Sequence, residues 1–365
     1  MPGGVAAMGV ARAGTTAIDW VVHSVRPVGP LGSVGLILPT IPWQEIPGGS
    51  GTTEGATTAH TTGVTDRLRT IVSAAEQAGA SGLWACDHLF WHRPLLEPLT
   101  SLAVAATAST SATLGTCVLQ LPMRNPAAVA RQAGTLQLLS GGRFVLGLGV
   151  GSHPGEYEAA AVDFSRRGRL LDDGIEALGR AWGSADRPGE RYRQEPTCSP
   201  IPIWLAGTSD AAVKRTARVG DGWVPFFIPP DDYRTARTRL FDLAIDAGRD
   251  PASIDTSVVA LVCAGDSSEV AHRAGTAWLA DLYDLPPKAF DRHLVAGTPE
   301  DCAAGIAAYH DAGASHVVVM VAADETLDHF GPVVEALRSR PSTDRAEVVT
   351  QLVASPQLEP LGANP

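Results

Sequence analysis

Lysine, paired cysteines and basic clusters are what this 365-residue sequence lacks, and each absence narrows the function classes. Lysine occurs only at Lys214 and Lys288, and the net charge is −11. This charge argues against nucleic acid and against an anionic membrane surface as partners. The five cysteines are widely spaced, odd in number and form no CxxC pair. We therefore expect reduced thiols, a cytoplasmic location, and neither a metal site nor a disulfide framework.

Long apolar runs and targeting signals are also missing. No stretch approaches the roughly 18 consecutive apolar residues of a membrane span, although 45% of the residues are hydrophobic. Residues 1–33 lack the ordered basic, apolar and cleavage regions of a signal peptide. We expect a soluble globular protein with a loose N-terminal extension at 1–33. Residues 341–365 are polar and rich in proline, which predicts a loose C-terminal tail.

Apolar segments and helical patterns alternate along residues 34–340. The expected strands are 34–38, 82–86, 114–120, 144–148, 201–206, 222–225, 256–263 and 316–321. Helix starts are clearest at Asn125, which precedes a proline, and at the capping box of 298–301. Residues 47–63 predict a long Gly/Thr-rich loop that could act as a mobile lid, whereas 275–296 show no defined pattern. Eight strand–helix alternations favour a (β/α)8 TIM barrel with insertion segments over a doubly wound sheet.

A (β/α)8 barrel carries its active site at the carboxyl ends of its strands, so the residues that follow each strand are the candidates. Asp87 and His88 follow the second strand; alone, such a pair is more often a surface or capping feature. Residues 206–209 precede a helix, where free N–H groups and two hydroxyls suit a phosphate. Ordinary capping by Ser209 is the alternative there. The Gly-rich run 149–156 lacks the GxGxxG spacing of a dinucleotide site and also fits a tight link.

Five segments carry a family resemblance, in the order SGLWACDH, LGTCVLQLPMRNPAAVARQ, SGGRFVLGLGVGS, PIWLAGTS and ARVGDGW. Together they resemble the bacterial luciferase-like flavin and deazaflavin oxidoreductases over about residues 34–340. The pattern is most similar to members that use the deazaflavin F420. The resemblance implies a flavin-type cofactor and a non-proline cis peptide bond behind its ring. The aligned bond in this sequence is Cys117–Val118.

The resemblance also implies roles for individual residues. Asp87 and His88 would form the catalytic pair, with His88 beside the reactive ring as a proton-transfer group. The implied cofactor contacts are Asp87, Cys117, Val118, Gln120, Val150, Gly151, Gly207, Thr208 and Ser209, the last three at the phosphate. Trp91 and Ser152 would line the substrate pocket. His153 and Glu156 are nearby pocket acids without an assigned role.

The expected function follows from these matches and from two departures. Ser152 stands where a sugar-phosphate-oxidising relative would need a glutamate, and the exit at 225–230 is apolar and without lysine. Both departures favour a neutral, partly hydrophobic small-molecule substrate. The leading hypothesis is an F420-dependent oxidoreductase that transfers a hydride between the deazaflavin and that substrate. Two alternatives stay open: an FMN-dependent monooxygenase that receives reduced flavin from a separate reductase and uses O2, and a non-catalytic flavin-binding protein. A homodimer is also open.

Overall fold

The computed structural model describes residues 33–38, 58–91, 93, 95–183 and 195–340, and its strands close into a parallel barrel. Its strands are β1 Ser33–Ile37, β2 Gly82–Ala85, β3 Thr113–Thr116, β4 Leu119–Gln120, β5 Phe144–Gly149, β6 Ile203–Leu205, β7 Gly222–Trp223, β8 Asp255–Ala264, β9 Leu294–Gly297 and β10 His316–Val321. The order around the barrel is β10-β1-β2-β3-β5-β6-β7-β8, and β8 pairs with β10 to close it. The expected TIM barrel is confirmed.

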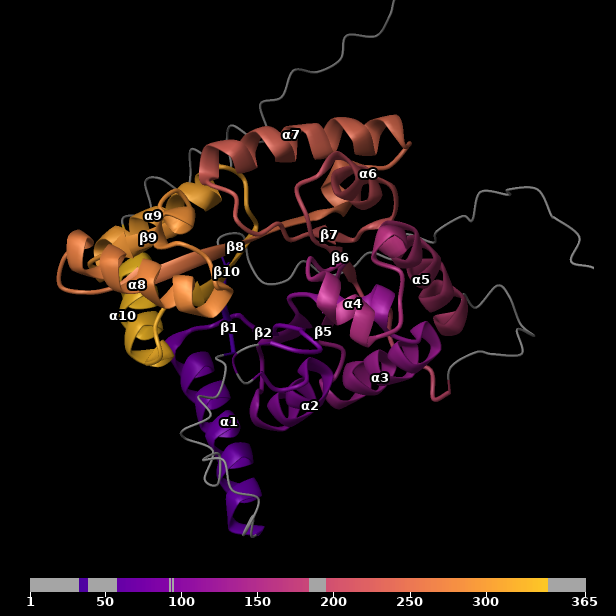
Figure 1. The fold of residues 1–365 in the computed structure, drawn as a ribbon, viewed down its shortest axis with the longest axis horizontal. Coiled ribbons are helices and arrows are strands. Elements are labelled where there is room, and N and C mark those ends of the chain that lie inside the picture. Colours follow the sequence, from indigo (N-terminus) through magenta and orange to yellow (C-terminus); the bar gives the residue numbers. More distant parts are fainter. Residues whose placement is uncertain (1–32, 39–57, 92, 94, 184–194, 341–365) are drawn as a thin grey trace, which may run out of the picture.

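Helices surround the strands in chain order, from α1 at the bottom of Figure 1 through α5 at the right and α7 at the top to α10 at the left. Their bounds are α1 Thr58–Ala78, α2 Pro98–Ala108, α3 Pro126–Leu139, α4 Pro154–Ala159, α5 Arg167–Trp182, α6 Asp210–Val219, α7 Pro230–Asp246, α8 Ser268–Tyr283, α9 Pro299–Asp311 and α10 Thr326–Ser339. The expected starts of α3 and α9 are confirmed, because Asn125 caps α3 and Thr298 forms a capping box with Asp301.

Strand β8 shows why these segments read as continuous apolar runs. Nine of its ten positions are buried, because a barrel strand faces the interior on one side and the helices on the other. Successive side chains alternate between these two layers. Val259 packs in the barrel interior, whereas Val258 and Ala260 pack in the core between strands and helices.

Two tryptophans fill the barrel interior. Trp84 of β2 stacks on Trp204 of β6 with ring centroids 4.9 Å apart, and its Nε1 donates to Nε2 of His316 on β10 at 3.2 Å. Both indoles need neighbours without a Cβ: a side chain at Gly115 would overlap Trp84, and one at Gly222 would overlap Trp204. Because side chains fill this part of the interior, space for a ligand lies further toward the carboxyl ends of the strands.

The third expected strand, 114–120, is interrupted. β3 ends at Thr116, β4 begins at Leu119, and the bond between Cys117 and Val118 is cis. The expected cis bond is confirmed. A continuous strand was wrong, because a cis bond takes the chain out of the regular strand path. β6 and β7 are likewise shorter than expected, with prolines at 202 and 225 beside them that provide no N–H for pairing.

Two further expectations need correction. Residues 58–63 belong to α1 and not to a loop, because a helix whose apolar residues dock, here Leu68 and Val72, extends cheaply by further turns. Ser33 already belongs to β1 and not to the N-terminal extension. The remainder of the expected lid, the expected tail 341–365 and the N-terminal extension apart from Ser33 lie outside the described residues.

The stretch 275–296 forms an insertion at the carboxyl end of the barrel. It contains the end of α8, a 3-10 turn at Pro287–Phe290 and most of β9. β7 pairs with β8 at residues 255–256, near the start of β8, whereas β9 pairs with residues 261–264 at its end. The insertion therefore adds a strand to the sheet at the carboxyl end of β8.

Candidate active site

A pocket opens where β1, β2 and β10 end, and α8 contributes one of its walls. Its lining is largely apolar and includes Leu38, Leu95, Trp278, Leu282, Tyr283 and Met320. His88 and Trp91 complete the side that follows β2. A few polar groups within an apolar lining are typical of small-molecule sites.

His88 and Trp91 form a stacked pair in this pocket. Their ring centroids are 4.0 Å apart, and the rings are inclined by 29°. His153 contacts the same pair edge-on, 4.9 Å from Trp91 and 5.6 Å from His88. Burial lowers the pKa of His88 below its ordinary value of 6.5, and the hydrogen bond to Glu156 partly opposes that shift. The imidazole is therefore held neutral at working pH, ready to accept or return a proton.

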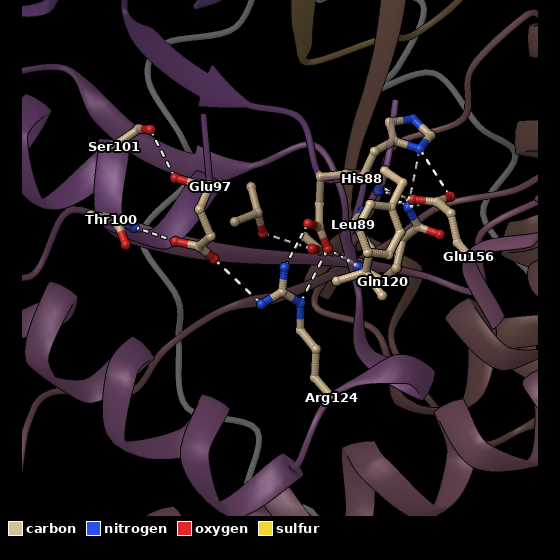
Figure 2. A network of polar contacts seen from close by, with 12 residues as sticks. His88, Leu89, Glu97, Thr100, Ser101, Gln120, Arg124 and Glu156 are labelled. Atoms are coloured by element: carbon tan, nitrogen blue, oxygen red, sulfur yellow. Dashed lines mark hydrogen bonds and ion pairs between the residues drawn. The ribbon is translucent and has the colours of Figure 1, made fainter. Parts of the chain in front are cut away.

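Glu156, in the first turn of α4, connects the two loops of the site. Its Oε2 lies 3.1 Å from Nδ1 of His88, and its Oε1 accepts from the backbone N–H groups of Leu89 at 2.6 Å and Phe90 at 3.2 Å. Figure 2 shows this carboxylate facing the imidazole ring. The residue is only 3% exposed, so its oxygens depend on these donors.

Asp87 faces the opposite way, toward Arg124. The guanidinium donates to both carboxylate oxygens, through Nη2 at 2.6 Å and Nε at 3.2 Å, and also pairs with Glu97 at 3.3 Å. The backbone N–H of Gln120 adds a third bond to Asp87 at 2.9 Å. Figure 2 shows Arg124 reaching between Glu97 and the loop of His88. These contacts make Asp87 an anchor of the loop; its contact with the cofactor stays a prediction.

Gln120 supplies one orphaned polar atom beside the pocket. Its Nε2 donates to the backbone oxygen of Asp87 at 2.7 Å, whereas its Oε1 is buried with no hydrogen-bond partner. Gly151 lies against this oxygen with a φ of +70°, and a Cβ there would overlap it. A buried acceptor without a donor is what a ligand N–H or O–H could satisfy.

The cis bond lies in a wall of small and sulfur-bearing residues. Cys117 and Val118 are half-buried, and a Cβ at Gly149 would lie 2.6 Å from Val118 Cγ2. Burial raises the pKa of Cys117 well above its ordinary value, and burial together with Asp87 raises that of Cys86 to about 12. Both thiols therefore stay protonated, and neither acts as a nucleophile.

The expected phosphate residues lie elsewhere on the same rim, after β6 and three strands further round than β2. Gly207 has a φ of +111°, and its carbonyl accepts from Trp223 Nε1 at 2.9 Å. Ser209 caps α6 through Ala212 N at 3.3 Å, as the ordinary interpretation predicts. Thr208 and Ser209 are exposed, so the start of this helix is open to an anion.

The structure thus brings His88, Trp91, Gln120 and Gly151 together and sets Gly207 to Ser209 apart as a second patch. Val150 is half-buried and accepts from the hydroxyl of Tyr157. Ser152 is exposed and is not among the residues that line the pocket.

Several residues of the site carried no usable signal in the sequence. Arg124 lies within a quoted motif, but nothing there indicates its pairing with Asp87. Trp278 and Tyr283 come from the insertion, where no pattern was defined. Among the described residues, no three His, Cys, Asp or Glu side chains gather as metal ligands. The described helices include none with the length and hydrophobicity needed to cross a membrane.

Comparison with known proteins identifies the class. The luciferase-like monooxygenase family model matches residues 48–316, so the chain belongs to this family of oxidoreductases and monooxygenases. A phthiodiolone/phenolphthiodiolone dimycocerosates ketoreductase from Mycobacterium kansasii is 27% identical over 333 residues, which cover 69% of this chain and 90% of that protein.

Solved structures with the same fold bind two kinds of cofactor. An F420-dependent secondary alcohol dehydrogenase, in complex with an F420–acetone adduct, has a TM-score of 0.64 at 18% identity and covers 75% of this chain and 96% of its own. The oxygenating constituent of 3,6-diketocamphane monooxygenase from Pseudomonas putida, in complex with FMN, has a TM-score of 0.60 at 17% identity and covers 84% and 95%. At these identities the likeness establishes the fold alone.

Proposed function

We propose that this protein is an F420-dependent oxidoreductase that interconverts a carbonyl group and a secondary alcohol on a neutral, largely apolar substrate. The observation that carries the proposal is the placement of His88, an imidazole stacked on Trp91 inside an apolar pocket. The ketoreductase relative and the alcohol dehydrogenase neighbour support this reaction class.

The residues present fit a deazaflavin. Cys117, Val118, Val150 and Gly151 would form a wall for a flat ring, and the orphaned Gln120 Oε1 offers an acceptor for a ring N–H. Gly207, Thr208 and Ser209, at the start of α6, would hold the phosphate. When bound, the cofactor supplies the hydride chemistry, which no side chain can provide.

The protein's own contribution is proton transfer, orientation and exclusion of water. In oxidation the neutral His88 would take the proton of the substrate hydroxyl, and in reduction the imidazolium form of His88 would return that proton to the substrate oxygen. Trp91 and Tyr283, whose rings meet edge-on with centroids 5.8 Å apart, form an apolar wall that keeps water from the reacting carbon. Ser152 would lie at the rim of the site, and Asp87 would anchor the His88 loop in addition to its predicted contact with the cofactor.

The test is titration of the purified protein with F420 and, separately, with FMN, followed by cofactor absorbance and fluorescence. We expect F420 to bind and reduced F420 to be oxidised by apolar ketones. Tight binding of FMN without binding of F420 would refute the proposal and favour the monooxygenase with a separate reductase. Binding of either cofactor without turnover of any ketone or alcohol would favour the non-catalytic alternative.

A variant pair locates the proton-transfer group. His88→Asn should lower kcat by about 10²–10⁴ while F420 still binds. His153→Asn, which changes the exposed neighbour in the same ring cluster, is the matched control and should retain most activity. Full activity of His88→Asn would remove His88 from the mechanism.

A further inference from the structure

The geometry points to Glu156 as the residue that fixes the tautomer and orientation of His88, with the proton on Nδ1 and with Nε2 left for the substrate. Glu156 comes from α4, after β5, whereas His88 follows β2. The catalytic consequence rests on the proposed function, but the tautomer itself does not.

Glu156 is held rigidly enough for this role. Its Oε1 accepts two successive backbone N–H groups, at 2.6 and 3.2 Å, from the residues directly after His88. These bonds tie the carboxylate to the same loop that carries the imidazole. Oε2 is consequently directed at the ring, 3.1 Å from Nδ1.

The position of the imidazole proton follows from the groups around Nδ1. A carboxylate oxygen accepts, so Nδ1 must donate if the 3.1 Å contact is a hydrogen bond. Gln120 Nε2 lies 3.4 Å from Nδ1, but it already donates to the backbone oxygen of Asp87 at 2.7 Å. The shorter contact with the carboxylate decides the tautomer.

With the proton on Nδ1, the lone pair of a neutral His88 is on Nε2. No described residue forms a hydrogen bond with Nε2, and His88 lines the pocket. A carboxylate that accepts from Nδ1 of a catalytic histidine also stabilises the imidazolium that forms when Nε2 takes a proton. Trp91 and His153 also contact His88, and the carboxylate of Asp87 lies nearby. His153 lowers the pKa of His88, and Asp87 raises it less than Glu156 does.

Glu156→Gln separates this role from a merely structural one. The glutamine oxygen can still accept from Leu89 and Phe90, because turning the amide would set its NH2 group against two donors. The amide nitrogen must then face Nδ1, which forces His88 to carry its proton on Nε2. Loop contacts are retained, whereas the tautomer is reversed.

The readout is the nitrogen-15 NMR spectrum of ring-labelled histidine in the cofactor-free protein, with His88 assigned by its loss in His88→Asn. We expect a neutral Nδ1–H tautomer in the wild type and Nε2–H in Glu156→Gln. Glu158→Gln, an exposed glutamate on the same helix, is the control and should leave the wild-type signal unchanged. An Nε2–H tautomer in the wild type, or an unchanged tautomer in Glu156→Gln, would overturn the inference.

Activity adds a second readout. Glu156→Gln should reduce kcat at least tenfold with little change in F420 affinity. The acid limb of its pH profile for alcohol oxidation should move to lower pH, because the carboxylate no longer favours the imidazolium. An unchanged kcat and pH profile would overturn the positioning role. If F420 fails to bind while the tautomer reverses as expected, the proposed function fails and the Glu156–His88 pair stands.

Discussion

Gly151→Ala tests how closely the wall of the site is packed. Gly151 has a φ of +70°, a region that favours glycine, and an added Cβ would overlap Gln120 Oε1 and lie 2.8 Å from Cδ. Gln120 is buried, and its Nε2 donates to the backbone oxygen of Asp87. The amide therefore has to leave this hydrogen bond if it moves away from the new methyl group.

The expected loss of stability has two parts. Placing alanine in the left-handed region costs about 1–2 kcal/mol, and breaking a buried hydrogen bond costs about 1–3 kcal/mol. Gly151→Ala should therefore lower the free energy of unfolding by about 2–5 kcal/mol. Gly248→Ala isolates the first part, because Gly248 has a φ of +73° and no atom within 4 Å of an added Cβ.

Urea unfolding, followed by tryptophan fluorescence and by far-UV circular dichroism, measures both variants. The difference between them should be about 1–3 kcal/mol, which is the cost of displacing Gln120. F420 affinity should fall only in Gly151→Ala, because only that change disturbs the wall. Equal destabilisation of the two variants would refute the reasoning, since Gln120 would then have room to move at no cost.

Two further predictions concern buried ionisable groups. Arg124→Leu leaves the carboxylate of Asp87, whose side chain is 1% exposed, without its ion pair, and should lower the free energy of unfolding in urea by about 3–5 kcal/mol. Adding Asp87→Asn should restore part of that loss in the double variant. Strictly additive losses from the two changes would contradict the ion pair as the cause. Burial lowers the pKa of His316 from 6.5 to about 3, so its stabilising effect is complete above pH 6.5 and is lost as the pH falls toward 3. At pH 4.5 the loss in the free energy of unfolding should be roughly 2–3 kcal/mol. In His316→Gln the free energy of unfolding should depend less steeply on pH, and an equal slope in both proteins would exclude His316 as the cause.

Local patterns in the sequence predicted much of the fold. Runs of apolar residues predicted the eight barrel strands, because a strand covered on both faces needs little else. Asn125 and Thr298 predicted the starts of α3 and α9, because capping depends on side chains within three residues. The insertion that contains Tyr283 was missed, because its strand β9 is short and forms only by pairing with β8.

Sequence reasoning also located one side of the site. His88 was found because it lies just beyond a buried strand, and Trp91 because the family resemblance implied a pocket tryptophan there. Both line the pocket. Trp278, on the opposite side, was not found because its place in the pocket depends on how α8 folds back over the barrel, which no local pattern encodes.

The sequence by itself determined the strands, the helix caps and the presence of Asp87 and His88 at a strand exit. Only the tertiary structure decided which carboxylate serves the histidine. Asp87 is its neighbour in the chain but turns toward Arg124, whose guanidinium donates to both of its carboxylate oxygens. Glu156 lies 68 residues away and contacts Nδ1, because parallel strands of a barrel bring their carboxyl ends to one rim.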